Sequence, residues 1–143
     1  MKFRTIALIL FLAGLLAFAF YNTDWFKPKV MKISYRQMRD QGTVFLLDQS
    51  YRLNDIKVMK TAEVDKAKPE LLWHMIGTTN TPSVTDFAYG SPIPGMQYFA
   101  DNRKVPVLEP NEKYRVIVRS GKLTGWKDFR LEAKTNAPAR PTP

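Results

Sequence analysis

The chain has 143 residues, and its 22 Lys and Arg against 13 Asp and Glu give a formal net charge of +9. This length suits one domain with one hydrophobic core. No cysteine is present, which excludes disulfide bonds, thiolate metal sites and cysteine nucleophiles.

The N-terminal segment, residues 1–21, is predicted to be a membrane anchor or a signal peptide. Residues 6–21 read IALILFLAGLLAFAFY and contain no charged side chain. Cleavage is one alternative, because Ala17-Phe18-Ala19 has the small residues that precede a signal-peptidase site. We favour an uncleaved anchor, because the apolar run continues into aromatic residues that suit a membrane interface. We expect the following domain to be translocated, since long domains cross largely regardless of flanking charge.

The segments that flank the central domain are short and contain proline. Residues 22–29 are expected to form a stalk, in which Pro28 disfavours helix. Residues 135–143 hold three prolines and no large apolar side chain, so a disordered tail is expected there.

The central domain, residues 30–134, is predicted to be built from strands. Its apolar residues recur at strand spacing in short runs separated by Gly, Pro, Asn and Asp. Helix is expected only for a turn or two within residues 60–72, because Pro69 interrupts it. The expected fold class is all-β, an antiparallel sandwich preceded by one apolar helix. The expected strands are residues 30–35, 43–47, 53–61, 71–76, 85–89, 97–100, 114–119 and 126–133.

The last two of these strands are expected to pair as a hairpin. Residues 120–125, SGKLTG, supply the reversal, since both glycines can adopt positive φ. Strand alternation directs one set of side chains inward, namely Tyr114, Val116, Val118, Phe129 and Leu131. It directs the other set outward, namely Arg115, Ile117, Arg119, Arg130 and Glu132.

The approach to this hairpin, Leu108-x-Pro110-x-x-x-Tyr114-x-Val116-x-Val118, resembles that of fibronectin type III and related immunoglobulin-like domains. The resemblance implies an immunoglobulin-like sandwich with a tyrosine corner, in which the tyrosine hydroxyl bonds to backbone a few residues upstream. It also implies that the leucine packs beneath the tyrosine and that Trp73 is the buried tryptophan of a central strand.

The apolar N-terminus, the "WH" strand and the stretch FAYGSPIPGM together are similar to small envelope proteins of Gram-negative bacteria. This resemblance implies a single-pass protein of the inner membrane with its domain in the periplasm. After signal cleavage the domain would instead be periplasmic or secreted. No activity follows from the resemblance.

No catalytic residue, metal site or cofactor is predicted. His74 is the only histidine, no Gly-x-Ser-x-Gly elbow is present, and no second histidine or cysteine could complete a zinc site. A surface or hydrogen-bonded histidine is therefore expected. The carboxylates are scattered and nothing selects a catalytic pair, and the chain lacks a phosphate-binding glycine loop. We expect a protein that is not an enzyme.

Two groups of residues are candidates for partner binding. In the first, Pro92 and Pro94 fix two φ angles, so the loop around them either protects a sheet edge or is a docking loop with Ile93 and Met96 as its apolar contacts. The second, on the outer side of the hairpin, consists of Trp126, Arg115 and Arg119, with Ile117 as a further exposed apolar side chain.

The expected function is a non-catalytic binding or assembly module anchored in the inner membrane. The soluble part is basic, which suits an envelope protein or an anionic polymer as partner, while the membrane segment disfavours nucleic acid. The alternative is a secreted carbohydrate- or ligand-binding sandwich released by signal cleavage. A small hydrolase that uses carboxylates is a third and weaker hypothesis.

Overall fold

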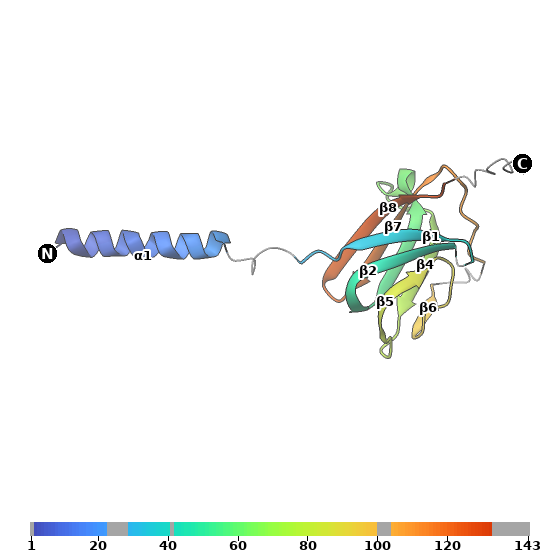
Figure 1. Cartoon of the computed structure of the whole chain (residues 1–143), viewed down its shortest axis with the longest axis horizontal. Coiled ribbons are helices and arrows are strands. Elements are labelled where there is room, and N and C mark those ends of the chain that lie inside the picture. The colour runs from blue at the N-terminus through green and yellow to red at the C-terminus, as the bar shows by residue number, and fades with distance from the viewer. Residues whose placement is uncertain (1, 23–28, 41, 100–103, 133–143) are drawn as a thin grey trace, which may run out of the picture.

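The computed structural model describes residues 2–22, 29–40, 42–99 and 104–132, and these form one helix and a two-layer β-sandwich (Figure 1). The expected fold class, an all-β sandwich preceded by one apolar helix, is confirmed. The tail at 135–143 and most of the expected stalk at 22–29 lie outside the described residues.

The helix α1 (Lys2–Asn22) contains a 19-residue apolar stretch, Phe3–Tyr21, whose side chains are exposed. At about 1.5 Å per residue such a stretch is about 29 Å long, which matches the hydrocarbon core of a bilayer. Length and composition thus suit a membrane span, and they suit a signal sequence equally.

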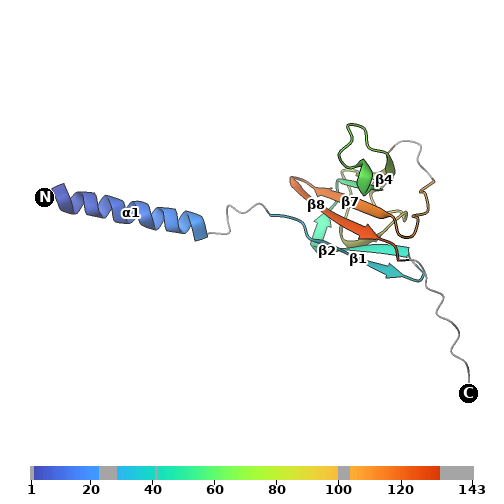
Figure 2. The same cartoon turned by 90° about the horizontal axis from the view of Figure 1, so that it is seen from above.

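The sandwich has a three-stranded and a five-stranded sheet, and all strand pairs are antiparallel (Figures 1 and 2). The smaller sheet has the order β1–β2–β5, formed by β1 (Ile33–Met38), β2 (Gly42–Arg52) and β5 (Ser83–Ala88). The larger sheet has the order β6–β4–β3–β7–β8, formed by β6 (Met96–Tyr98), β4 (Leu71–Gly77), β3 (Asp55–Lys60), β7 (Lys113–Ser120) and β8 (Leu123–Arg130).

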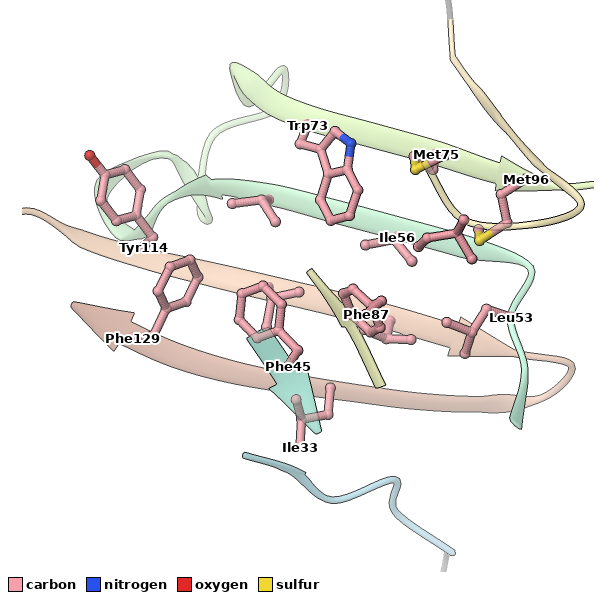
Figure 3. Packing of buried hydrophobic residues seen from close by; sticks show 14 of the residues in the cluster. Ile33, Phe45, Leu53, Ile56, Trp73, Met75, Phe87, Met96, Tyr114 and Phe129 are labelled. Atoms are coloured by element: carbon pink, nitrogen blue, oxygen red, sulfur yellow. The ribbon is translucent and has the colours of Figure 1, made fainter. Parts of the chain in front are cut away.

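The hydrophobic core lies between the two sheets, as Figure 3 shows. Phe45 of the smaller sheet packs against Phe129 of the larger one, with ring centroids 5.0 Å apart. Trp73 and Tyr114 are each 1% exposed and Val116 is fully buried, so the expected core positions are confirmed. Because successive side chains of a strand alternate between faces, these burials fix which side of the five-stranded sheet faces outward.

The tyrosine corner implied by the fibronectin resemblance is present. The Tyr114 hydroxyl oxygen accepts a hydrogen bond from the backbone N–H of Glu109 at 2.8 Å. Leu108 is buried in the same core cluster. The bond ties the loop before β7 to the start of that strand and satisfies a polar group that the core would otherwise leave unpaired.

The turn expected at residues 120–125 is shorter in the structure, because residues 123–125 belong to β8. The turn consists of Gly121 and Lys122 alone, with φ of 57° at Gly121, and Ser120 already pairs with Leu123. Gly125 lies inside β8, where a Cβ atom would be 2.6 Å from the backbone oxygen of Met31. This glycine is therefore required for a close approach of two chain segments rather than for a turn.

Other expected boundaries also differ from the structure. β1 begins at Ile33 rather than at Val30, and β2 continues to Arg52, past the expected end at residue 47, through an irregular register between Leu46 and Tyr51. This irregularity explains why the sequence pattern predicts that the strand ends at residue 47. A bulge interrupts the two-residue repeat by which side chains alternate between the faces of a sheet. The short helix expected within residues 60–72 is the single 3-10 turn η2 (Thr61–Glu63).

Candidate functional site

The outer face of the five-stranded sheet carries the strongest candidate site. Exposed large apolar side chains lie on it, with Trp126 on the edge strand β8 and Ile76 and Phe99 on the side of β4 and β6. Cross-strand pairing places Ile117 opposite both Trp126 and Lys57. We call this surface the outer face; its principal residues are Asp55, Lys57, His74, Ile76, Phe99, Arg115, Ile117, Arg119, Trp126 and Asp128.

Trp126 is 56% exposed on the edge strand β8, and its neighbours hold it in place. The guanidinium carbon of Arg115 lies 4.1 Å from the centre of the indole ring, a cation–π contact. Arg115 in turn donates two hydrogen bonds to Asp128, from Nε at 2.6 Å and from Nη2 at 2.9 Å. The indole is thus an exposed apolar surface backed by a fixed, planar ion pair.

The ion pair also changes the titration of its members. The hydrogen bonds from Arg115 lower the pKa of the Asp128 carboxyl, and the same bonds raise the pKa of the guanidinium. Both shifts favour the charged forms. Arg119, four residues after Arg115 on β7, is exposed and has no ion pair within the described residues.

His74 lies on the same outer face but is only 8% exposed, because the ring of Phe99 packs on it at a centroid distance of 4.6 Å. Its Nε2 is 2.7 Å from Oδ1 of Asp55, and the other oxygen of this carboxylate is 3.1 Å from Nζ of Lys57. The expectation of a hydrogen-bonded histidine is met at Nε2, while Nδ1 is buried without a partner.

The proline loop divides into exposed and buried residues. Pro92 and Pro94 are exposed, whereas Ile93 and Met96 are 6% and 9% exposed and belong to the core. The expectation that Ile93 and Met96 offer apolar contacts to a partner therefore needs correction, since both side chains already pack inside the sandwich. Whether the loop binds a partner through its prolines stays a prediction.

This loop is held firmly to the neighbouring turn. The hydroxyl of the buried Thr81 lies 2.7 Å from the backbone oxygen of Gly95 and 2.8 Å from that of Thr78. Gly95 has a φ of 73°, and a Cβ there would be 2.6 Å from the Cα of Thr81. The loop precedes β6, at the edge of the sheet opposite to β8, so the structure does not bring it together with Trp126.

The described residues can be compared with the usual requirements of a ligand pocket and of a metal site. A depression of about 230 Å³, lined by Tyr35, Gln37, Arg130 and Glu132, opens where β1 meets β8, and it is smaller than typical ligand pockets. In the parts of the chain that the structure describes, no three His, Asp or Glu side chains cluster as a metal site would require.

Sequence reasoning missed Phe99, Ile76 and the partners of Arg115 and His74. The pairing of Arg115 with Asp128 could have been predicted if a two-residue turn had been assumed, because that turn places the two residues opposite each other. The pairing of β3 with β4 joins His74 to Asp55 across 19 positions, and no local pattern carries that information.

The chain matches no protein-family model, and the comparisons found no significant match among curated proteins or solved structures.

Proposed function

We propose that this protein is a non-catalytic binding module, anchored by α1 in the inner membrane of a Gram-negative bacterium, whose periplasmic sandwich binds a protein partner. The binding site is the outer face, with Trp126 as the central contact. The observation that carries the proposal is an exposed indole stacked on the guanidinium of Arg115, which Asp128 binds in turn.

A fixed exposed tryptophan is suited to binding. Tryptophan and arginine are enriched among the residues that dominate protein interfaces, and tryptophan buries much area for little loss of conformational freedom. The guanidinium of Arg115 lies against the ring of Trp126 and favours the observed orientation of the indole before a partner binds. Ile117 is paired with it across the strands and supplies adjoining apolar surface, although its side chain is half-buried and not exposed as expected.

The remainder of the outer face adds selectivity to this contact. Arg119 is exposed and unpaired within the described residues, so it is available to an acidic group of the partner. Phe99 and Ile76 supply further exposed apolar surface at the β6 side of the sheet. The anchor α1 would confine the module to the membrane surface and so raise its effective concentration there.

The strand order supports an immunoglobulin-like domain of the fibronectin type III kind. Numbered along the chain, β1, β2 and β5 correspond to strands A, B and E, and β3, β7 and β8 correspond to strands C, F and G of such sandwiches. β4 occupies the position of C′ beside C, and β6 is an added edge strand. The tyrosine corner of Tyr114 is the second observation in favour of this type.

Several observations also support a role without catalysis. The one histidine is covered by Phe99 and bonded to Asp55, so it has little access to a substrate. The depression beside Gln37 is open and shallow, and Gln37 uses its side chain to bond the Arg130 carbonyl at 3.1 Å.

Site-directed photo-crosslinking in cells would test the binding face. A photoreactive residue at Thr124, which is exposed on the outer face near Trp126, is expected to give a discrete adduct with a partner. A probe at Ser34, exposed on the smaller sheet, is the matched control and is expected to give none. Adducts at Ser34 alone would contradict the proposal.

A second candidate function is a carbohydrate- or ligand-binding domain released by signal cleavage. The exposed ring of Trp126 favours it, because sugar rings also stack on flat aromatic surfaces. The intact mass of the protein purified from cells separates the two: loss of the residues through Ala19 supports the released domain, and a full-length mass supports the anchor.

A further inference from the structure

The chain that follows α1 enters the sandwich at the end where the β7–β8 turn lies. The backbone oxygen of Met31 lies against Gly125, near the start of β8, and the backbone N–H of Asp48 donates to the oxygen of Lys32 at 3.1 Å. In Figure 1 the blue chain reaches the sandwich on the side of the β7–β8 turn, whereas β8 ends on the other side. The β7–β8 turn therefore lies at the end nearest to α1 along the chain.

Two further turns meet at this end. The backbone N–H of Asn54 donates to the oxygen of Arg119 at 2.8 Å, and the Ser120 hydroxyl donates to the oxygen of Arg52 at 2.7 Å. The N–H of Gly77 donates to the oxygen of Asn54 at 2.7 Å, which brings the β4–β5 loop alongside.

Five exposed cationic side chains gather at this end, and within the described residues none of them forms an ion pair. Two carboxylates lie nearby and are outnumbered by these cations: Asp55 contacts Lys57 and His74, and Asp48 accepts a hydrogen bond from the Tyr51 hydroxyl at 3.0 Å. We call this surface the basic end; its cations are Lys29, Lys32, Arg52, Arg119 and Lys122.

The opposite end of the sandwich carries no such excess. Its described segments include residues 38–40, 60–70, 104–113 and 130–132, and each of them has as many Asp and Glu as Lys and Arg. The excess positive charge is thus concentrated at the end where the chain enters the sandwich. Basic residues that served only solubility would not need to be concentrated at one end.

The length of the connection keeps the basic end close to α1. Seven residues lead from Asn22 to Lys29, and a fully extended chain of that length spans at most about 25 Å. Electrostatic attraction to a charged bilayer acts over about 8 Å at physiological salt, and a tether of at most about 25 Å allows the basic end to come within that distance.

We propose that the basic end binds the anionic headgroups of the same bilayer that α1 crosses. Lys29, Lys32, Arg52, Arg119 and Lys122 would contact the lipid phosphates, and the long axis of the sandwich would then stand away from the membrane with the outer face accessible from the side. This inference rests on the proposed anchoring role of α1, and of the five cations only Arg119 also belongs to the proposed partner site.

Fluorescence quenching of the full chain in vesicles tests this orientation. Because the chain has no cysteine, Thr79→Cys in the β4–β5 loop and Ala67→Cys after η2 give single labelling positions, at the basic end and at the opposite end respectively. The dye is quenched by a spin-labelled lipid headgroup in vesicles of phosphatidylcholine, or of equal parts phosphatidylcholine and phosphatidylglycerol.

The dye at position 79 is expected to be quenched about twofold more strongly in the vesicles with phosphatidylglycerol, and high salt is expected to remove the difference. The dye at position 67 is expected to show no dependence on lipid charge. The triple variant Arg52→Gln, Arg119→Gln and Lys122→Gln is expected to abolish the difference at position 79. The matched control, with Lys68, Lys104 and Lys113 each changed to Gln, is expected to preserve it.

Equal quenching in both vesicles at position 79, or an equal loss in the control variant, would overturn the inference. No other protein is present in the vesicles, so the result does not depend on the partner-binding proposal. Intact mass of the protein from cells tests anchoring separately, which keeps failure of the anchor distinguishable from failure of lipid binding.

Discussion

The guanidinium of Arg115 lies between Trp126 and Asp128: it stacks on the indole ring at 4.1 Å and binds the carboxylate through two nitrogen atoms. All three residues are on the outer side of one hairpin, and the two-residue turn at Gly121 and Lys122 sets the register that joins them. The local geometry of a turn thus determines the shape of the candidate binding surface.

Removal of the carboxylate is expected to have a small, pH-dependent effect on stability. The pKa of Asp128 is lowered in the folded protein, so the ion pair stabilises the fold above the ordinary aspartate pKa and is lost as the pH falls through the lowered value. Asp128→Asn is expected to cost about 0.2–1 kcal/mol at neutral pH, because the carboxylate is partly exposed, and the cost should vanish in strong acid.

Urea unfolding of the full chain in detergent, followed by tryptophan emission at neutral and at acidic pH, measures this difference. Asp40→Asn, in an exposed turn without an ion pair in the described residues, is the control for the loss of a surface carboxylate. A cost at Asp128 that grows as the pH is lowered would contradict the assignment.

The tyrosine corner is expected to contribute measurably to folding. Tyr114→Phe removes the hydroxyl that accepts from the N–H of Glu109 and should lower the free energy of unfolding by about 1–2 kcal/mol. Tyr35→Phe is the matched control, since the half-buried hydroxyl of Tyr35 has no hydrogen bond within the described residues. The same urea titration compares them, and equal values for the two variants would argue against the corner.

A methyl group at position 125 is expected to disturb the approach of the N-terminal segment to β8. The Cβ atom would lie 2.6 Å from the Met31 backbone oxygen and 2.8 Å from the Met31 Cβ, so one segment has to shift. Gly125→Ala should cost about 1–3 kcal/mol, whereas Lys127→Ala on the same strand should cost less than about 0.5 kcal/mol. Denaturation midpoints that are the same for both variants would contradict this packing.

The proline loop is expected to matter first for stability. Ile93→Ala removes a buried side chain and should cost about 2–4 kcal/mol, whereas Pro92→Ala at an exposed position should cost less than about 1 kcal/mol. Thermal unfolding of the two variants side by side measures the difference. The opposite ranking would show that the loop is not held through its apolar side chain.

The inward and outward faces of β7 could be predicted from the sequence, because Tyr114, Val116 and Val118 alternate with a second set of residues that includes Arg115 and Arg119, and one side of the sheet is dry. The corner could be predicted because its residues are close in the chain. The role of Gly125 could not, since the atom that it must approach belongs to Met31, 94 positions away.

The candidate site was predicted only in part for the same reason. Trp126, Arg115 and Arg119 follow from alternation along single strands, and the structure places all three on the outer face. Ile93 and Met96 look like loop residues in the sequence, and only the packing of the loop beneath its prolines shows that they are core residues. Phe99 covers His74 through the β4–β6 pairing, which depends on a crossover between sheets.

Co-purification from native membranes tests the proposed binding face most directly. The tagged full chain and its Val107→Ala variant, changed at a highly exposed apolar residue outside the outer face, are expected to recover the same partner protein. Trp126→Ala is expected to lower that recovery by about tenfold or more at unchanged folding stability, since the side chain is exposed in the free protein. Undiminished recovery with Trp126→Ala would contradict the assignment of the outer face as the binding site.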